Sequence, residues 1–175
     1  MRTYLIAFLD VIFCALIIVL FMIRPPEDKD IMKPAGVLNI MTAWPDVSFN
    51  DDVDTWLLGP GMKKPIGYDN KNSEACDLVK DDVGVDFSKF PLNFENIFCR
   101  DARDGEYIIN LHGFSIIEET EVQVQIVLND TILFDENIIV KGHKDEQTVI
   151  RFKLKDGKLV PGSVHHTFVS LFDMQ

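Results

Sequence analysis

The chain has 175 residues and a mass of 20.0 kDa, which is enough for one domain of ordinary size and excludes a large multidomain enzyme. Its mean hydropathy is +0.08 although 26% of its residues are charged, so the apolar residues must be segregated along the chain. The net charge is −11. Because nucleic-acid binding by counterion release needs a basic face, this charge excludes a nucleic-acid partner.

The apolar residues are concentrated at the N-terminal end. Residues 4–23 contain a single charged residue, Asp10, and every other acidic residue of the chain lies beyond position 24. Twenty helical residues span about 30 Å, the thickness of the hydrocarbon core of a bilayer. The sequence therefore predicts a short head at 1–3, a transmembrane helix at 4–23 in contact with membrane lipid, a charged linker at 24–35 and an acidic domain at 36–175.

A cleaved signal peptide is the alternative interpretation of the same segment. Against it, the apolar run is longer than a usual signal-peptide core, Asp10 interrupts it, and no small-x-small cleavage site precedes Arg24. The flanking charges do not fix the orientation, because Arg2 lies on one side of the run and Arg24, Lys29 and Lys33 lie on the other.

Two of the three cysteines, Cys76 and Cys99, lie in the predicted domain, and Cys14 lies in the predicted span. A disulfide between the first two would close a loop of about 24 residues and contribute about 3 kcal/mol in an oxidising compartment. Two buried free thiols are the alternative. A cysteine or histidine metal site is not predicted, since the cysteines have no C-x-x-C partner and the histidines lack ligand spacing.

Asp10 is the most informative residue of the predicted span. An ionisable side chain facing lipid costs several kcal/mol, so such residues usually face a protein interior or a water-filled path and mark ion routes. Asp10 could therefore take up and release a proton. The alternative is that it makes a helix–helix hydrogen bond and has no role in transport.

The run Leu9–Ile23, LDVIFCALIIVLFMI, resembles the single helix of the ExbD/TolR and MotB stator subunits. In that family an L-D-V-x-F start is followed by a Leu/Ile/Phe-rich run. The resemblance implies that Asp10 carries H⁺ or Na⁺, that the N-terminus is cytoplasmic in a bacterial inner membrane, and that the C-terminal domain is periplasmic. It also implies a homodimer inside a ring of MotA/TolQ/ExbB-like multi-helix subunits. The domain that follows resembles neither periplasmic domain known in the family.

The first part of the domain contains two predicted strands. Gly36–Trp44 and Thr55–Leu58 are rich in β-forming residues, and Gly59-Pro60-Gly61 closes the second. The interval from Lys63 to Arg103 is predicted to be irregular because turn-forming residues are spread along it.

After Asp104-Gly105 the pattern is regular and predicts a β-sandwich. Runs rich in Val, Ile and Phe predict strands at residues 106–114, 121–128, 131–140, 147–154 and 164–172. Turn signals separate them at 129–130, 141–142 and 156–157. Within the second of these strands, Val122, Val124 and Ile126 should face the core, because they alternate with polar residues. The expected fold is one N-terminal transmembrane helix followed by an all-β ectodomain.

Acidic residues are crowded ahead of Trp56. Asp52 and Asp54 have a D-x-D spacing, and hard oxygen ligands of this kind suit Ca²⁺, so these two residues are candidate metal ligands. The later Gly and Glu of an EF-hand are missing. Acidic turn formers and a solvated surface are the alternative interpretation. Other acidic residues of the same region are Asp51, Asp69, Asp81, Asp82 and Asp86. The segment DVDTWLLGP also resembles part of uncharacterised bacterial β-sandwich ectodomains, some of which follow ExbD-like anchors.

Enzyme motifs are absent from the sequence. It contains no G-x-S-x-G, no H-E-x-x-H and no phosphate-binding glycine loop, so we predict no enzymatic activity and, apart from Ca²⁺, no cofactor. Two functions remain. The first is an ion-driven stator subunit whose ectodomain transmits force or engages an envelope partner. The second is a membrane-anchored periplasmic module that binds glycan, peptide or calcium without ion coupling.

Overall fold

The computed structural model of the chain describes residues 38–45, 51–82 and 93–174. The chain separates into the units Met1–Lys33 and Pro34–Gln175, and all described residues belong to the second. The predicted head, transmembrane helix and linker lie outside the described residues. Within the described ranges, no helix is both long enough and apolar enough to span a membrane.

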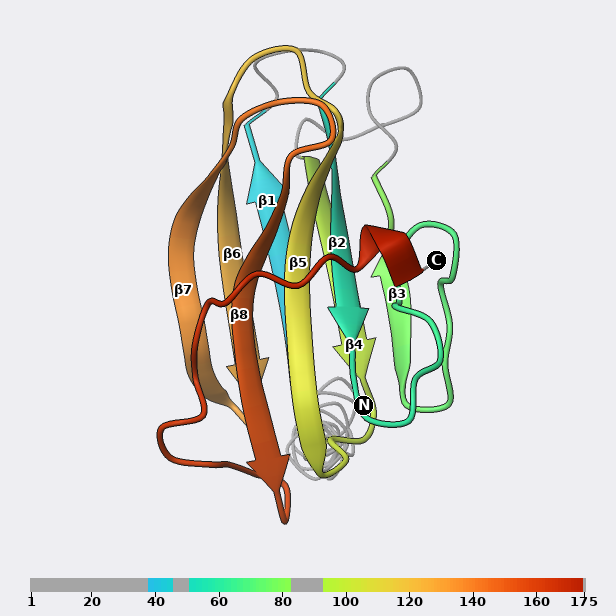
Figure 1. The fold of residues 1–175 in the computed structure, drawn as a ribbon, viewed down its shortest axis with the longest axis vertical. Helices are drawn as coiled ribbons and strands as arrows, with labels where there is room; N and C mark the ends of the chain where they lie inside the picture. The colour runs from blue at the N-terminus through green and yellow to red at the C-terminus, as the bar shows by residue number, and fades with distance from the viewer. Residues whose placement is uncertain (1–37, 46–50, 83–92, 175) are drawn as a thin grey trace, which may run out of the picture. The chain divides into compact units, whose positions relative to one another are not determined.

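The described part is a β-sandwich of two antiparallel sheets (Figure 1). The five-stranded sheet has the order β3-β4-β1-β6-β7, and the four-stranded sheet has the order β2-β5-β8-β9. The strands of the first sheet are β1 (Leu38–Trp44), β3 (Cys76–Lys80), β4 (Asn93–Cys99), β6 (Thr120–Leu128) and β7 (Thr131–Val140). Those of the second are β2 (Asp52–Leu58), β5 (Gly105–Ser115), β8 (Glu146–Lys155) and β9 (Lys158–Leu159). The predicted all-β sandwich is confirmed for this part of the chain.

The core lies between the two sheets and follows the alternation of the strands. Val122, Val124 and Ile126 of β6 are fully buried, as predicted. They share one hydrophobic cluster with Ile109 of β5 and Ile150 of β8 in the facing sheet. Burying such a side chain contributes about 1.5–3 kcal/mol, so the facing apolar surfaces hold the two sheets together.

Two of the predicted turns form tight hairpins. Asn129 and Asp130, with φ of 49° and 62°, connect β6 to β7, and Asp156 and Gly157, with φ of 51° and 66°, connect β8 to β9. Two consecutive residues in the left-handed region match the twist of the flanking strands, and Asn, Asp and Gly tolerate that region best. The turn chemistry therefore fixes the register of both hairpins.

The prediction that residues 63–103 are irregular is wrong, because β3 and β4 lie in this interval. In β4 the inward-facing residues include Asn93 and Glu95, whereas Phe94 and Phe98 are more exposed than their neighbours. Polar residues on the buried side and aromatic residues on the other side hide the alternation by which a half-buried strand is recognised.

The predicted strand at 164–172 is also wrong. After β9 the chain makes one isolated bridge, between His165 and Arg151, and then crosses in front of β8, β5 and β2 in Figure 1. Side chains replace a backbone ladder here: Val169 N donates to Thr148 Oγ1 over 3.0 Å, and Leu171 N donates to Glu146 Oε1 over 2.6 Å. The segment ends in the 3₁₀ turn η1 (Phe172–Met174).

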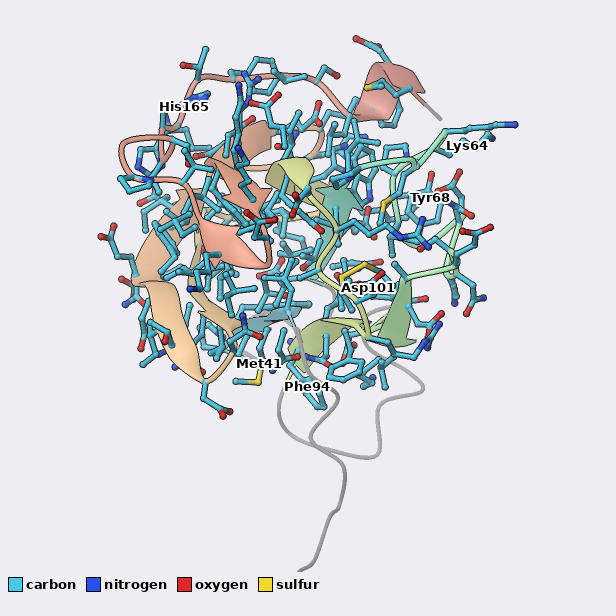
Figure 2. The ribbon with its side chains drawn as sticks, turned by 90° about the horizontal axis from the view of Figure 1, so that it is seen from below. Met41, Lys64, Tyr68, Phe94, Asp101 and His165 are labelled. Atoms are coloured by element: carbon cyan, nitrogen blue, oxygen red, sulfur yellow. A yellow bond between two sulfur atoms is a disulfide. The ribbon has the colours of Figure 1, made fainter. Side chains whose placement is uncertain are left out.

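A disulfide joins Cys76 of β3 to Cys99 of β4, which lie directly opposite each other in the strand register (Figure 2). The bond links the edge strand β3 to the rest of the five-stranded sheet. In the same view Met41 and Phe94 lie together on one side of the sandwich, and His165 lies on the opposite side.

Replacing the cystine by Cys76→Ala and Cys99→Ala should lower the free energy of unfolding by about 2–4 kcal/mol, because the unfolded chain loses a closed loop. The measurement is urea denaturation of the full-length protein without reductant. Cys14→Ala is the control and should unfold like the wild type. A double variant that unfolds at the wild-type urea concentration would show that this disulfide contributes nothing to stability.

Candidate functional site

The site begins at the free edge of β2, which starts at Asp52, three residues before the predicted strand. Among the described strands β2 pairs with β5 alone, so its other edge needs partners. Leu57 exchanges two backbone hydrogen bonds with Ile66, of 3.0 and 2.8 Å. The backbone N–H of Thr55 donates to Oε2 of Glu95 over 2.5 Å. A carboxylate from the other sheet therefore caps this edge.

Glu95 is buried with one of its oxygens unsatisfied. Its exposed fraction is 1%, and within the described part of the chain Oε1 has no hydrogen-bond partner. Burial raises the pKa of Glu95 well above its ordinary value, and the charge of Asp54 raises it further. A buried carboxylate in this state favours a proton or a cation on its free oxygen.

Three carboxylates converge at this point. Asp54 of β2, Asp81 just after β3 and Glu95 of β4 each offer an oxygen atom, and these three atoms lie within 4.8 Å of one another. The topology explains the convergence. The β3 strand pairs with β4 and ends at Lys80, so Asp81 lies beside β4. The hydrogen bond from Thr55 N–H holds Glu95 at the edge of β2.

Asp52 lies next to this triad without belonging to it. It lies two residues before Asp54 in β2, is 8% exposed, and its Oδ1 has no hydrogen-bond partner among the described residues. Burial, followed by the charges of Asp54, Asp81 and Asp82, raises the pKa of Asp52 to about 7. Of the two ligands predicted from the D-x-D spacing, the structure thus places Asp54 in the triad and Asp52 beside it.

Two lysines partly balance the acidic charge. Lys71 Nζ lies 2.6 Å from Asp81 Oδ2, and Lys80 Nζ lies 3.3 Å from Asp82 Oδ2. Both lysine side chains are solvent-exposed to a third or more, so water weakens these pairs. Neither of these two ion pairs involves Glu95.

An aromatic stack borders the triad. The ring of His112 stacks on Trp56 at 4.9 Å and on Phe172 at 5.3 Å between centroids, and its Nδ1 lies 3.3 Å from Asp54 Oδ2. A Cβ atom at Gly67 would lie 2.4 Å from Cδ1 of Trp56, so the loop can approach the indole only with glycine at that position. The stack holds the His112 ring beside Asp54, whose exposed fraction is 3%.

The other acidic residues singled out in the sequence do different things. Asp51 accepts hydrogen bonds from Ile117 N, over 3.2 Å, and from Thr120 Oγ1, over 2.8 Å, and so has a structural role. Asp69 is exposed, and Asp86 lies outside the described residues. Sequence reasoning missed Glu95, because a lone glutamate in a strand that was not predicted gives no signal of its position.

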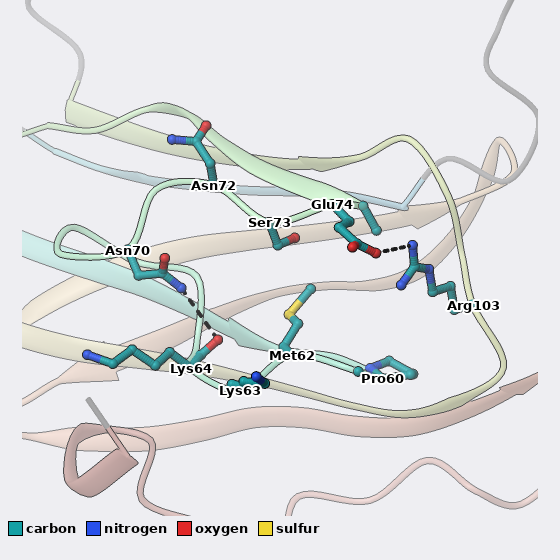
Figure 3. Close-up of a pocket in the computed structure, with 11 residues that line it drawn as sticks. Pro60, Met62, Lys63, Lys64, Asn70, Asn72, Ser73, Glu74 and Arg103 are labelled. Atoms are coloured by element: carbon teal, nitrogen blue, oxygen red, sulfur yellow. Dashed lines mark hydrogen bonds and ion pairs between the residues drawn. The ribbon is translucent and has the colours of Figure 1, made fainter.

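A separate cleft lies between the β2–β3 connection and the segment leading into β5 (Figure 3). Its volume is about 350 Å³, and Arg103 Nη2 closes one end by contacting Glu74 Oε2 over 3.0 Å. The charged side chains of its lining, Lys63, Lys64, Glu74 and Arg103, are all exposed. The cleft therefore lacks the buried charge that distinguishes the acidic triad.

Comparisons with known proteins address the fold. No protein-family model and no curated protein matches the chain. A solved structure described as "Crystal structure of unknown function protein SAV2460" is similar, with a TM-score of 0.50 and 14% identity over 77% of this chain and 91% of that one. The similarity shows the fold alone.

The raised pKa of Asp52 predicts that stability falls as pH rises. The folded protein keeps the Asp52 proton up to about pH 7, whereas the unfolded chain releases it near its ordinary pKa of 3.8. In the presence of a chelator, Asp52→Asn should therefore raise the apparent Tm clearly more at about pH 8, above both pKa values, than at about pH 5, where only part of the stability has been lost. Thermal denaturation at the two pH values measures this, with the exposed Glu119→Gln as control. An equal effect of Asp52→Asn at both values would contradict it.

Proposed function

We propose that the chain is an ion-motive-force-coupled stator subunit of an ExbB–ExbD/MotA–MotB-like inner-membrane complex. The observation that carries the proposal is Asp10, the single charged residue of the apolar run 4–23, in a sequence context that resembles the stator helix. A carboxylate in such a run is costly unless the protein uses it to bind or move an ion.

The mechanism follows from the chemistry of that carboxylate. Two copies of the helix would lie inside a ring of multi-helix subunits, and each Asp10 would take up and release an ion in turn. Neutralisation lets the side chain pass an apolar ring surface, and loss of the ion makes it seek a polar partner. Relative rotation of ring and dimer is then coupled to the ion gradient.

The described domain suits the part of a stator subunit that acts outside the membrane. The Cys76–Cys99 disulfide supports a periplasmic location, because disulfides persist in oxidising compartments. It also ties the edge strand β3 to β4, so that a load applied to β3 is shared by the sheet. The domain would transmit force or engage an envelope partner on the periplasmic side of the membrane.

Asp10→Asn should abolish ion flux while leaving assembly intact, because asparagine keeps the shape of the side chain and cannot release a proton. The measurement uses the full-length protein co-purified with its multi-helix partner from its own membranes and reconstituted in liposomes with a pH-sensitive or sodium-sensitive dye. Asp10→Glu is the matched control and should retain part of the flux. A ring complex whose flux is unchanged by Asp10→Asn would rule out coupling through this residue.

A second candidate function is a membrane-anchored periplasmic binding module for glycan, peptide or calcium. The acidic triad of Asp54, Asp81 and Glu95 favours it. In this case Asp10 would serve helix association, no multi-helix partner would co-purify, and Asp10→Asn would leave ligand binding unchanged. Co-purification from the native membrane therefore separates the two candidates.

A further inference from the structure

We propose that Asp54, Asp81 and Glu95 form a calcium site that bridges the two sheets of the sandwich. This inference goes beyond ion coupling at Asp10 and holds whether or not that residue carries ions, since it rests on the described residues alone. It also gives the binding-module candidate a specific ligand.

The spacing of the three carboxylates suits Ca²⁺. Calcium binds oxygen at about 2.3–2.6 Å, so two ligands on opposite sides of the ion lie about 5 Å apart. One carboxylate oxygen from each of the three residues lies within 4.8 Å of the other two. Mg²⁺ requires oxygens at about 2.0–2.1 Å in a near-ideal octahedron and retains several waters, which a set of ligands on three separate segments serves less well.

The observation that points to a bound cation, beyond the clustering of acids, is the unsatisfied oxygen of Glu95. Its Oε2 is occupied by the Thr55 N–H, and Oε1 is left without a donor in the described structure, at a side chain that is 99% buried. The nearby Asp52 Oδ1 is also buried and lacks a partner there. Such atoms are costly to bury unless a cation or a proton satisfies them.

The types of side chain favour calcium over softer metals. Zinc prefers nitrogen and sulfur ligands, whereas the triad supplies carboxylate oxygen alone. The imidazole of His112 contacts the triad through Nδ1, which lies 3.3 Å from Asp54 Oδ2, and its ring packs against the rings of Trp56 and Phe172. Cys76 and Cys99 are in a disulfide and so offer no thiolate.

An ion in this position would have a structural effect. Asp54 belongs to the four-stranded sheet, whereas Glu95 and Asp81 belong to the five-stranded sheet and the chain just after it. Calcium would therefore fasten the free edge of β2 to the opposite sheet beside the Thr55–Glu95 hydrogen bond. Because an ion that binds only the folded state stabilises it, calcium should raise the apparent Tm.

The competing account is a shared proton. A proton held between Glu95 and a neighbouring carboxyl group would satisfy Oε1 without any metal. Under that account calcium has no effect on stability. The two accounts therefore differ in a measurable response to calcium at constant pH.

The test is thermal unfolding of the full-length protein in detergent. The protein is treated with EDTA, desalted, and then supplied with CaCl₂ or MgCl₂ at a constant pH of about 7.5, above the ordinary pKa of a carboxyl group. At a calcium concentration about a hundred times Kd, the apparent Tm should rise by about 5–10 °C. Magnesium should give a clearly smaller shift. Calorimetric titration with CaCl₂ should show binding to one site per chain.

Glu95→Gln is the decisive variant. Glutamine retains an oxygen that accepts from Thr55 N–H and removes the buried charge, so the metal-free variant should be at least as stable as the wild type. Its calcium-dependent shift should be lost. Glu119→Gln, an exposed replacement of the same chemistry, should keep the full shift, and Asp81→Asn provides a second site variant if Glu95→Gln does not fold.

Three results would overturn the proposal: a wild-type protein whose Tm does not respond to calcium, a Glu95→Gln variant that keeps the full response, or equal responses to calcium and magnesium. Asp10→Asn should retain the calcium shift. The two proposals therefore fail separately: unchanged ion flux in Asp10→Asn contradicts ion coupling alone, whereas a full calcium shift in Glu95→Gln contradicts the calcium site alone.

Discussion

The hydrogen bond from the Thr55 N–H to the Glu95 carboxylate is the constraint around which the site is organised. An edge strand has backbone donors with no strand to receive them, and here a side chain from the opposite sheet receives one. The consequence is an ionisable group placed in the interior. Asp54 and Asp81 then lie near it because β2 and the end of β3 meet at the same edge.

The C-terminal segment uses a second glutamate in a related way. Glu146 of β8 accepts from Leu171 N and from the Ser170 hydroxyl, and so anchors the last described residues of the chain. This places Phe172 against Trp56 and His112. Two carboxylates therefore organise the region. Glu95 caps the edge of β2, and Glu146 holds the C-terminal segment that packs against Trp56 of the same strand.

Local patterns in the sequence were sufficient for much of the fold. The alternation in β6 and the Asn129-Asp130 turn correctly gave the β6–β7 hairpin, because both depend on neighbours in sequence. Glu95 could not be placed in this way, since it lies 40 residues from Thr55 and faces inward from a strand whose aromatic residues face the other side. The D-x-D spacing identified Asp54, but its partners are brought to it by strand pairing, which no short motif records.

The two proposals concern different parts of the chain and different ions. Asp10 is proposed to exchange an ion rapidly along a gradient, whereas the triad is proposed to hold an ion in order to fix the geometry of the sandwich. A stator must transmit load through its ectodomain, so an ion that fastens the two sheets would serve the mechanical role as well as a binding role. The calcium site does not require the stator function.

The most direct test of the central claim is a crystal structure of the protein grown with calcium, with anomalous diffraction recorded to identify the ion. The account predicts one calcium peak with an oxygen of each of Asp54, Asp81 and Glu95 at about 2.3–2.6 Å. A structure with no peak at this position, in which the Glu95 carboxyl group makes a hydrogen bond to a neighbouring carboxyl group, would contradict it.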